Sequence, residues 1–377
     1  MTERYDVVII GGGPAGAGAS YELADAGAKV LVIEKAKYPR PKLCAGCISK
    51  RSVDLFPAFN IKNSIKGGIL GFKGQEFVEK VSDECAVIVD RKEFDHFLIS
   101  KAQEKGAHLL EEITVKDIEL TPTVRKVITD KGVFEADYVI GADGYHSVTR
   151  KSIACKSASR KFFIAMEVKV PKDMFKDFKE DEVLIDIGVV KKGYGWYFPQ
   201  GEFVNIGIAT AEKEDLLNIF KAYTKNHKLF PIDIAKYRIK SWFIPFISKV
   251  QELRLGRDRV FLTGDAGAIV DPLLGEGIRY AYLSGSLCAR AIKLAKKDAH
   301  SLYERFVKNT ILEDLIYAGK IASIVYNIQE LSFKLSQDKA LYMFFELLKG
   351  EKTYKDLYRW GWKELVKNIP KILIKMI

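Results

Sequence analysis

The chain begins with an apolar, β-branched run that leads directly into glycines, and this stretch constrains the fold more than any other. Residues 6–10 read Asp-Val-Val-Ile-Ile, and Gly11, Gly13 and Gly16 follow them, before an alanine-rich helical pattern over residues 17–26. Gly11 allows a tight turn, Gly13 lets a pyrophosphate approach the backbone, and Gly16 lets the helix pack against the strand. The sequence therefore predicts a buried parallel strand, a phosphate-binding turn and a helix whose N-terminus faces the phosphates.

A second strand follows at the spacing that a βαβ unit requires. The strand over residues 29–33 is apolar and mostly β-branched after Lys29, and it ends at Glu34. In dinucleotide-binding units, an acid at about this distance from the glycines holds a ribose hydroxyl. Strand, glycines, helix, strand and acid in register indicate a bound dinucleotide rather than an empty βαβ unit.

Two further apolar strands, far along the chain, also end in glycine and an acid. One strand, over residues 138–140, runs into Asp143, and another, over residues 259–263, runs into Gly264 and Asp265. Ligands of parallel sheets bind at the carboxyl ends of the strands. FAD has adenosine, pyrophosphate, ribityl and ring segments to contact, so three such turns favour FAD as the cofactor.

Composition narrows the partners and the compartment. The chain of 377 residues carries 60 Lys and Arg against 49 Asp and Glu, a formal net charge of +11, which favours anionic partners. Nucleic acid is not expected, because no nucleic-acid motif accompanies the charge. The first strand begins near residue 6, and no apolar run reaches the ~20 residues that span a bilayer. We expect a cytoplasmic protein, with peripheral membrane contact left open.

A basic, proline-broken loop follows Glu34. It carries six cations between Lys35 and Arg51, which form either a solvated face or an anion site for a substrate head group. Within it, Cys44 and Cys47 suggest an active-site thiol at Cys44 or a redox dithiol; no metal is expected, because the other cysteines are scattered singly. Arg91 stands near a predicted helix start, where a cation is unfavourable, so it is either exposed or grips cofactor phosphate or ribose.

The pattern along the chain predicts an α/β fold (α+β overall) in four parts. Residues 1–157 and 251–300 form an FAD-binding, Rossmann-like domain, with inserted strands within residues 64–90. Residues 158–250 alternate like an antiparallel sheet and form a substrate domain. Residues 301–377 form a C-terminal helical region.

Two features of these later parts leave alternatives open. The box at residues 194–199, Tyr-Gly-Trp-Tyr-Phe-Pro, is either core or a substrate surface. After it, helices are expected over residues 212–225 and from Ile232. The last residues, 362–376, combine apolar positions and lysines at helical spacing, which indicates a helix packed on the body or one lying on anionic lipid.

These motifs carry a family resemblance. The three turns resemble the FAD motifs of p-hydroxybenzoate hydroxylase-type flavoproteins. The loop at residues 42–46, the box at residues 194–199 and the stretch at residues 271–278 more narrowly resemble the geranylgeranyl reductase family. The family typically has glycine after the loop cysteine, where this chain has Ala45, and Cys47 is an addition.

The resemblance and the turns together imply the site residues. For FAD they are Gly11, Gly13, Ala15, Gly16, Glu34, Lys35, Cys44, Ala45, Cys47, Arg91, Val115, Asp143, Gly264, Asp265, Gly275, Gly277 and Ile278. For a prenyl substrate they are Lys42, Tyr194, Trp196, Phe198 and Pro199. Cys44 and Tyr194 are the expected catalytic residues.

The resemblance implies reduction of isolated C=C bonds of a polyprenyl lipid or prenyl diphosphate. A hydride from reduced flavin and a proton, first of all from Cys44, would add across the bond, and aromatic rings would stabilise the developing cation. NAD(P)H or a reduced ferredoxin would supply the electrons. Two alternatives remain: a flavin monooxygenase or halogenase on the same fold, and a non-catalytic carrier of flavin or prenyl lipid.

Overall fold

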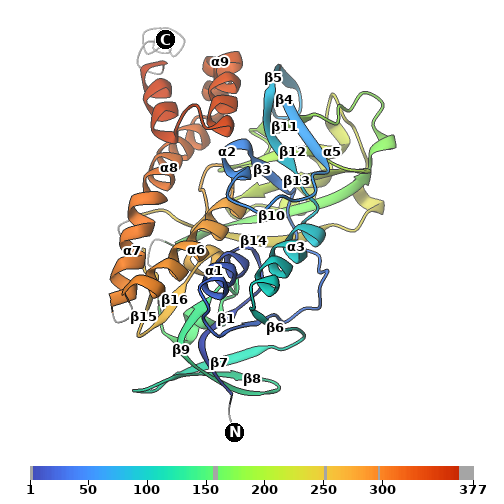
Figure 1. The fold of residues 1–377 in the computed structure, drawn as a ribbon. Coiled ribbons are helices and arrows are strands. Elements are labelled where there is room, and N and C mark those ends of the chain that lie inside the picture. Colours follow the sequence, from blue (N-terminus) through green and yellow to red (C-terminus); the bar gives the residue numbers. More distant parts are fainter. Residues whose placement is uncertain (1–2, 156–159, 250–252, 296–297, 365–377) are drawn as a thin grey trace.

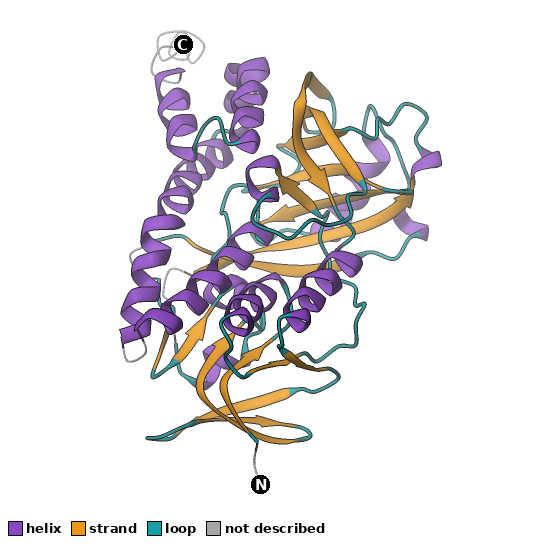
Figure 2. Ribbon diagram, viewed as in Figure 1, coloured by secondary structure: helices purple, strands orange, loops and turns teal. Residues whose placement is uncertain are grey.

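The protein contains two β-sheets and a column of C-terminal helices (Figures 1 and 2). The computed structural model describes residues 3–155, 160–249, 253–295 and 298–364. The first sheet, near the N-terminus, and the second sheet lie on the same side of the helical column. The C-terminal segment from residue 365, where the lysine-rich helix is expected, lies outside the described residues.

The first sheet is built around the predicted βαβ unit. Its central strands are parallel: β1 (Arg4–Ile10) pairs with β2 (Val30–Ile33) on one side and with β9 (Gly132–Gly141) on the other. α1 (Pro14–Asp25) connects β1 to β2. The remaining members are β6 (His108–Leu110), β16 (Val260–Leu262), β15 (Gly256–Arg257), β7 (Val115–Leu120) and β8 (Arg125–Thr129). The three predicted turns therefore follow neighbouring parallel strands, β1, β9 and β16.

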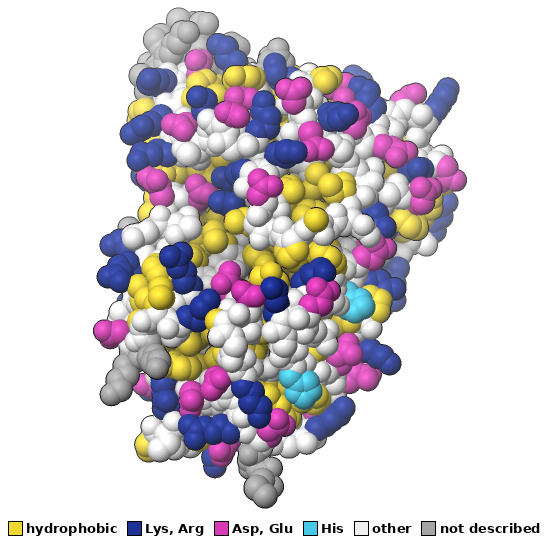
Figure 3. Space-filling view, viewed as in Figure 1, with side chains coloured by type: hydrophobic (Ala, Val, Ile, Leu, Met, Phe, Trp, Pro, Cys, Tyr) yellow, Lys and Arg dark blue, Asp and Glu magenta, His cyan; other side chains and the backbone are white. Residues whose placement is uncertain are grey.

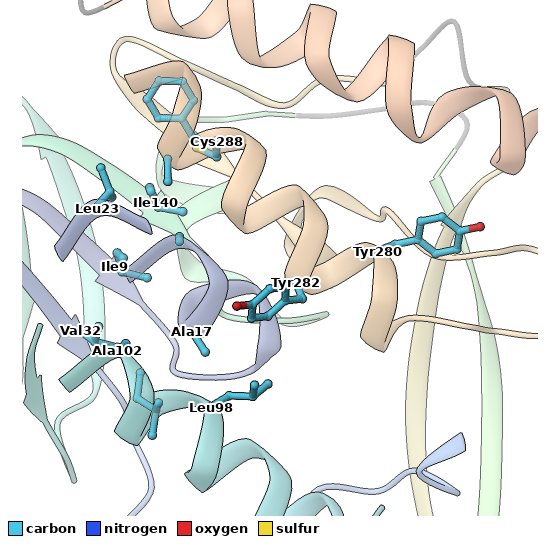
Figure 4. Close-up of a cluster of buried hydrophobic side chains, with 14 of the residues drawn as sticks. Ile9, Ala17, Leu23, Val32, Leu98, Ala102, Ile140, Tyr280, Tyr282 and Cys288 are labelled. Atoms are coloured by element: carbon cyan, nitrogen blue, oxygen red, sulfur yellow. The ribbon is translucent and has the colours of Figure 1, made fainter. Parts of the chain in front are cut away.

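α1 packs closely against two other helices, α3 (Arg91–Glu104) and α6 (Ile278–Ala295). A Cβ at Gly285 of α6 would lie 2.0 Å from the carbonyl oxygen of Ala15, so this contact requires a glycine. Figure 4 shows the apolar cluster that results, with Ile9, Leu98 and Cys288 drawn from a strand and two helices. This core fixes the orientation of α1, and with it the direction in which the helix N-terminus points.

The second sheet contains more of the chain than the sequence predicts. In spatial order its strands are β14 (Lys240–Ile247), β10 (Arg160–Pro171), β13 (Phe203–Thr210), β12 (Gly193–Gln200), β11 (Glu182–Ile187), β4 (Asn63–Phe72), β5 (Glu76–Ile88) and β3 (Cys47–Ser49). The strands expected within residues 64–90 belong to this sheet, and β4 pairs in parallel with β11. This parallel pair makes the sheet mixed rather than purely antiparallel. The sequence does not predict it, because the local alternation of residues indicates a strand but not the distant strand with which it pairs.

The helix expected from Ile232 is wrong. That segment forms a short 3-10 turn, η2 (Ile234–Lys236), and then β14. Ile232 and Ile234 flank Asp233, and this two-residue spacing of apolar side chains is not the period of a helix. The other expected helix is present as α5 (Leu216–Asn226) and covers one face of the sheet.

The C-terminal region is helical, as predicted. Its helices are α7 (Ala299–Thr310), α8 (Leu312–Asn327), α9 (Gln329–Lys349) and residues 354–364, and the shorter helices elsewhere are α2 (Lys50–Val53), α4 (Val148–Ser152), η1 (Lys172–Met174) and η4 (Gly264–Gly267). α9 packs on β4 and β5 of the second sheet. In the part of the chain that the structure describes, no helix is both long and apolar enough to cross a bilayer. On the face shown in Figure 3, charged side chains occupy much of the outer surface, and hydrophobic side chains gather across the middle.

Candidate functional site

A cavity of about 590 Å³ is lined by residues from both sheets. The ends of β1, β2 and β9 form one part of its wall, and β10, β12 and β13 of the second sheet form another. Most of the residues predicted for the cofactor and substrate line this cavity: Gly11, Gly13, Ala15, Glu34, Lys35, Lys42, Cys44, Ala45, Cys47, Arg91, Val115, Asp143, Tyr194, Trp196, Phe198, Asp265, Gly275, Gly277 and Ile278.

Three predicted site residues, Gly16, Gly264 and Pro199, are not among those lining the cavity. A Cβ at Gly16 would lie 1.9 Å from the carbonyl oxygen of Gly11, so Gly16 allows the helix to approach the strand. Gly264 lies against Ala15 and Ala281 in the same helix packing. Pro199 lies one residue beyond Phe198, so its side chain points to the opposite face of β12.

The N-terminus of α1 is open toward a ligand. Gly13 is its N-cap, Pro14 follows, and the first turn has no side-chain cap and no acidic residue. The unpaired backbone N–H groups and the helix dipole favour a phosphate at this end. Since the cavity wall includes Gly11, Gly13 and Ala15, the residues present fit a dinucleotide such as FAD.

Glu34 is held at the edge of the cavity by three contacts. Its carboxylate accepts hydrogen bonds from the backbone N–H of Gly12 at 3.0 Å and of Ala36 at 3.1 Å, and it pairs with Arg40 Nε at 3.3 Å. The side chain is buried. A carboxylate fixed in this way suits the predicted contact to a ribose hydroxyl.

Arg91 is buried, and the alternative of an exposed arginine is wrong. Its Nε and Nη2 donate to the two Asp95 oxygens at 2.7 and 2.9 Å, and Arg40 Nη1 reaches the same carboxylate at 3.2 Å. Burial lowers the pKa of the Arg91 guanidinium, but Asp95 and Cys44 together outweigh burial, so the pKa is raised. Two permanent cations therefore stand at the cavity wall, fixed by one buried acid that sequence reasoning missed.

The cysteine loop is shaped by Gly46, which has φ +77° and a backbone N–H that donates to Cys44 Sγ at 3.4 Å. Both cysteines are free thiols, and the Cys44 thiol lies beside the Arg91 guanidinium. Burial strongly raises the pKa of Cys47, so that thiol stays protonated at neutral pH. Gln200 Nε2 donates to the Ala45 carbonyl at 3.1 Å and ties the loop to β12.

Three of the six cations of this loop form ion pairs with acids, and two of the others line the cavity. Arg51 pairs with Glu276 and Asp314, each at 3.3 Å, and Lys50 pairs with Glu84. Arg40 pairs with Glu34 and Asp95 and also lines the cavity. Lys35 and Lys42 line the cavity, and Lys42 Nζ lies 4.0 Å from the centre of the Trp242 ring.

The aromatic box presents alternate side chains to the cavity. Tyr194, Trp196 and Phe198 share that face of β12. The Trp196 indole N–H donates to Asn205 Oδ1 at 2.7 Å, and a Cβ at Gly207 would lie 2.2 Å from the indole, so the ring is fixed in place. The Tyr194 hydroxyl donates a hydrogen bond to the carbonyl of Leu274. Its proton is therefore already in a hydrogen bond, whereas a catalytic role would require it to be donated to substrate.

The loop at residues 271–278 is held by the C-terminal helices. The buried Asp271 carboxylate accepts the Tyr354 hydroxyl at 2.7 Å and the Leu273 N–H at 2.7 Å. The Tyr326 hydroxyl donates to the Leu273 carbonyl. Burial raises the pKa of Asp271 to about 6. Sequence reasoning missed Tyr326 and Tyr354, because single tyrosines in a helical pattern give no signal of such contacts.

A second, almost wholly apolar cavity of about 220 Å³ adjoins this region. It lies between the second sheet and the C-terminal helices, with Ile69 and Leu70 on one side and Ile321 and Phe345 on the other. Five residues line both cavities: Val183, Ile185, Tyr194, Leu274 and Phe344.

Comparison of the sequence with known families and proteins shows the class to which the chain belongs. Residues 4–283 match the sequence model of the FAD binding domain family, so the chain is an FAD-binding flavoprotein. It is 30% identical over 356 residues to a digeranylgeranylglycerophospholipid reductase of Methanocaldococcus jannaschii, covering 88% of this chain and 89% of that protein. An uncharacterized protein of Methanosarcina barkeri is 32% identical over 343 residues, covering 88% and 87%. The chain belongs to the geranylgeranyl reductase family of oxidoreductases, which confirms the resemblance seen in the motifs.

Solved structures show the same fold. A geranylgeranyl bacteriochlorophyll reductase-like protein from Thermoplasma acidophilum superposes with a TM-score of 0.78 at 21% identity, over 97% of this chain and 100% of that chain. A flavin-dependent brominase superposes with a TM-score of 0.71 at 18% identity, over 97% of this chain and 100% of that chain. At these identities the likeness extends to the fold alone.

Proposed function

We propose that the protein saturates isolated double bonds of a polyprenyl chain, using FAD held against the three strand-end turns. The observation that carries this proposal is the lining of one cavity by both the glycine turns and the aromatic face of Tyr194, Trp196 and Phe198. The adjoining apolar cavity has room for further hydrocarbon. Relatives named as prenyl-lipid reductases support the substrate class.

The chain's own residues divide the work of binding. The N–H groups of α1, Glu34 and the Arg40–Arg91 pair would hold the nucleotide, and FAD bound there would supply hydride chemistry. Lys42, over Trp242 at the cavity wall, would hold a phosphate or diphosphate head group. The apolar walls would orient the chain and exclude water.

The aromatic box would also act on the reacting bond. An isolated alkene has no carbonyl to take up charge, so protonation leaves a developing tertiary cation. The faces of Trp196 and Tyr194 attract such a cation through the ring quadrupole. The indole is held by Asn205 and therefore needs no reorganisation when charge appears.

Anaerobic incubation of FAD-loaded, dithionite-reduced protein with geranylgeranyl diphosphate and with a digeranylgeranylglycerol phospholipid tests the proposal. Mass spectrometry should show gain of hydrogen pairs in one of them, and the flavin should be reoxidised in step. A flavin monooxygenase or halogenase would instead consume oxygen when substrate is added. A carrier would bind both ligands without reoxidation, and either outcome would contradict the proposal. NAD(P)H or reduced ferredoxin, substituted for dithionite, would then identify the electron donor.

A further inference from the structure

The proposed reaction requires a proton donor on the substrate side of the cavity, and the thiol predicted for it is a weak acid. An unperturbed cysteine has a pKa of about 8.5, against about 4.3 for glutamate. A carboxylic acid kept protonated in an apolar site is a stronger donor to carbon than a thiol.

Six carboxyl side chains line the cavity, and five of them are accounted for by their place in the fold. Three of these carboxyl groups form ion pairs with arginines, and the two that follow β9 and β16 belong to the predicted nucleotide-binding turns. The six are Glu34, Asp95, Asp143, Glu167, Asp265 and Glu276. Glu167 is the one of these six that lies on the second sheet, on β10, beside the aromatic box.

Glu167 is linked directly to the residues expected to contact substrate. It lies opposite Gly207 in the β10–β13 register, and Gly207 is the glycine that makes room for the Trp196 indole. The Asn205 side chain, which accepts the indole N–H, lies beside the Glu167 carboxyl group. Ala165, two residues earlier on the same strand face, also lines the cavity.

The surroundings of Glu167 shift its ionisation toward the neutral form. The side chain is buried, and Oε2 has no hydrogen-bond partner among the described residues. Burial raises its pKa above the ordinary value, while Asn205, Lys169, the Cys44 N–H and Lys240 oppose this less strongly.

We propose that Glu167 is the general acid of the alkene reduction, an inference that rests on the proposed function. The carboxyl O–H bond breaks as a C–H bond forms at the less substituted alkene carbon, using the π electrons. FAD held in the cavity in its reduced form would supply the hydride for the second C–H bond, at the tertiary carbon, so that the alkene would be reduced and the flavin oxidised. The Glu167 carboxylate then recovers a proton from water. Cys44, whose backbone N–H faces this carboxylate, is a positioning residue of the same wall.

Single-turnover reduction separates the two candidate acids. Dithionite-reduced, FAD-loaded protein is mixed without oxygen with the prenyl substrate that the wild type reduces, and flavin reoxidation is followed. Glu167→Gln should slow this step by about 10²-fold or more, the typical effect of a general acid, whereas Cys44→Ala should slow it by less than about tenfold. Glu182→Gln is the matched control, because Glu182 is also buried on this sheet but does not line either cavity.

A second readout does not depend on turnover. The infrared difference spectrum between the FAD-free wild type and Glu167→Gln should show a protonated carboxyl band that decreases as the pH rises, because the Asp271 carboxyl is present in both proteins and cancels. FAD affinity should be the same in Glu167→Gln and Glu182→Gln as in the wild type. A Glu167→Gln rate within about threefold of the wild type, or no carboxyl band in the difference spectrum, would overturn the inference. Absence of FAD binding or alkene reduction in the wild type would instead overturn the proposed function.

Discussion

The buried carboxylate of Asp271 should make stability fall as the pH rises from 4 to 7. Burial raises the pKa of this group from 3.8 to about 6, although Tyr354 and two backbone N–H groups donate to it. In the unfolded chain the carboxyl releases its proton near pH 3.9. Between the two pKa values the folded state therefore binds more protons than the unfolded state, so the free energy of unfolding decreases with rising pH.

The magnitude follows from the size of the shift. A difference of about 2 pKa units, at about 1.4 kcal/mol per unit, corresponds to about 3 kcal/mol. This contribution is fully present below pH 4 and is lost as the pH passes 6. Asp271→Asn removes the titrating group, so the wild type should gain about 2 kcal/mol relative to the variant when the pH is lowered from 7 to 4, and the rest as the unfolded carboxyl is protonated at lower pH.

Urea unfolding of the FAD-free wild type and variant, at intervals of one pH unit, measures this difference. The test is how the difference in the free energy of unfolding between wild type and variant changes with pH. Its absolute value is not used, because the variant also changes hydrogen bonds by an amount that does not depend on pH. The other buried acids are present in both proteins, so their contributions to the pH dependence cancel in this difference. Parallel pH profiles for wild type and variant would refute the assignment of this pKa to Asp271.

Two further substitutions test the geometry of the nucleotide side. Asp95→Ala leaves the Arg91 and Arg40 guanidiniums without their shared acid and should lower the free energy of unfolding by about 3–5 kcal/mol; a change below 1 kcal/mol in urea unfolding would contradict a shared buried ion pair. Gly16→Ala places a Cβ 1.9 Å from the Gly11 carbonyl oxygen, so the turn must shift, and flavin fluorescence titration should show loss of FAD binding; unchanged affinity would contradict the close approach.

Much of the first sheet could be predicted because its signals are local. Strand, glycine turn and helix are continuous in the sequence. The turn after β1 carries glycines, its acid, Glu34, follows β2, and the turns after β9 and β16 each carry a glycine and an acid. Parallel strands then bring the three turns to one edge of the sheet. The assignment of β4 and β5 to the second sheet could not be predicted in this way, because β4 pairs with β11 more than a hundred residues later.

The acid at position 167 was missed for a different reason. Glutamate and lysine alternate with apolar residues in β10, which is typical of a strand with one solvated face. A signal was nevertheless present, since Phe163 and Ala165 occupy the same strand face as Glu167 and are apolar. An acid that continues an apolar face either meets water at the sheet edge or enters a cavity. The choice between water and a cavity depends on the cysteine loop, which packs over this face through the hydrogen bond from Gln200 to the Ala45 carbonyl.

The aromatic box shows why the choice between core and substrate surface could not be made from spacing. Side chains of β12 alternate between two faces that are both covered. Tyr197 points into the core beneath α5, where it contacts Phe175 and Phe230, while Tyr194 and Trp196 point into the cavity. The core alternative is therefore confirmed for Tyr197, while substrate contact by Tyr194 and Trp196 stays a prediction. What separates them is the facing layer: a helix fills the space on one side, and on the other side the first sheet and the cysteine loop leave it open for a ligand.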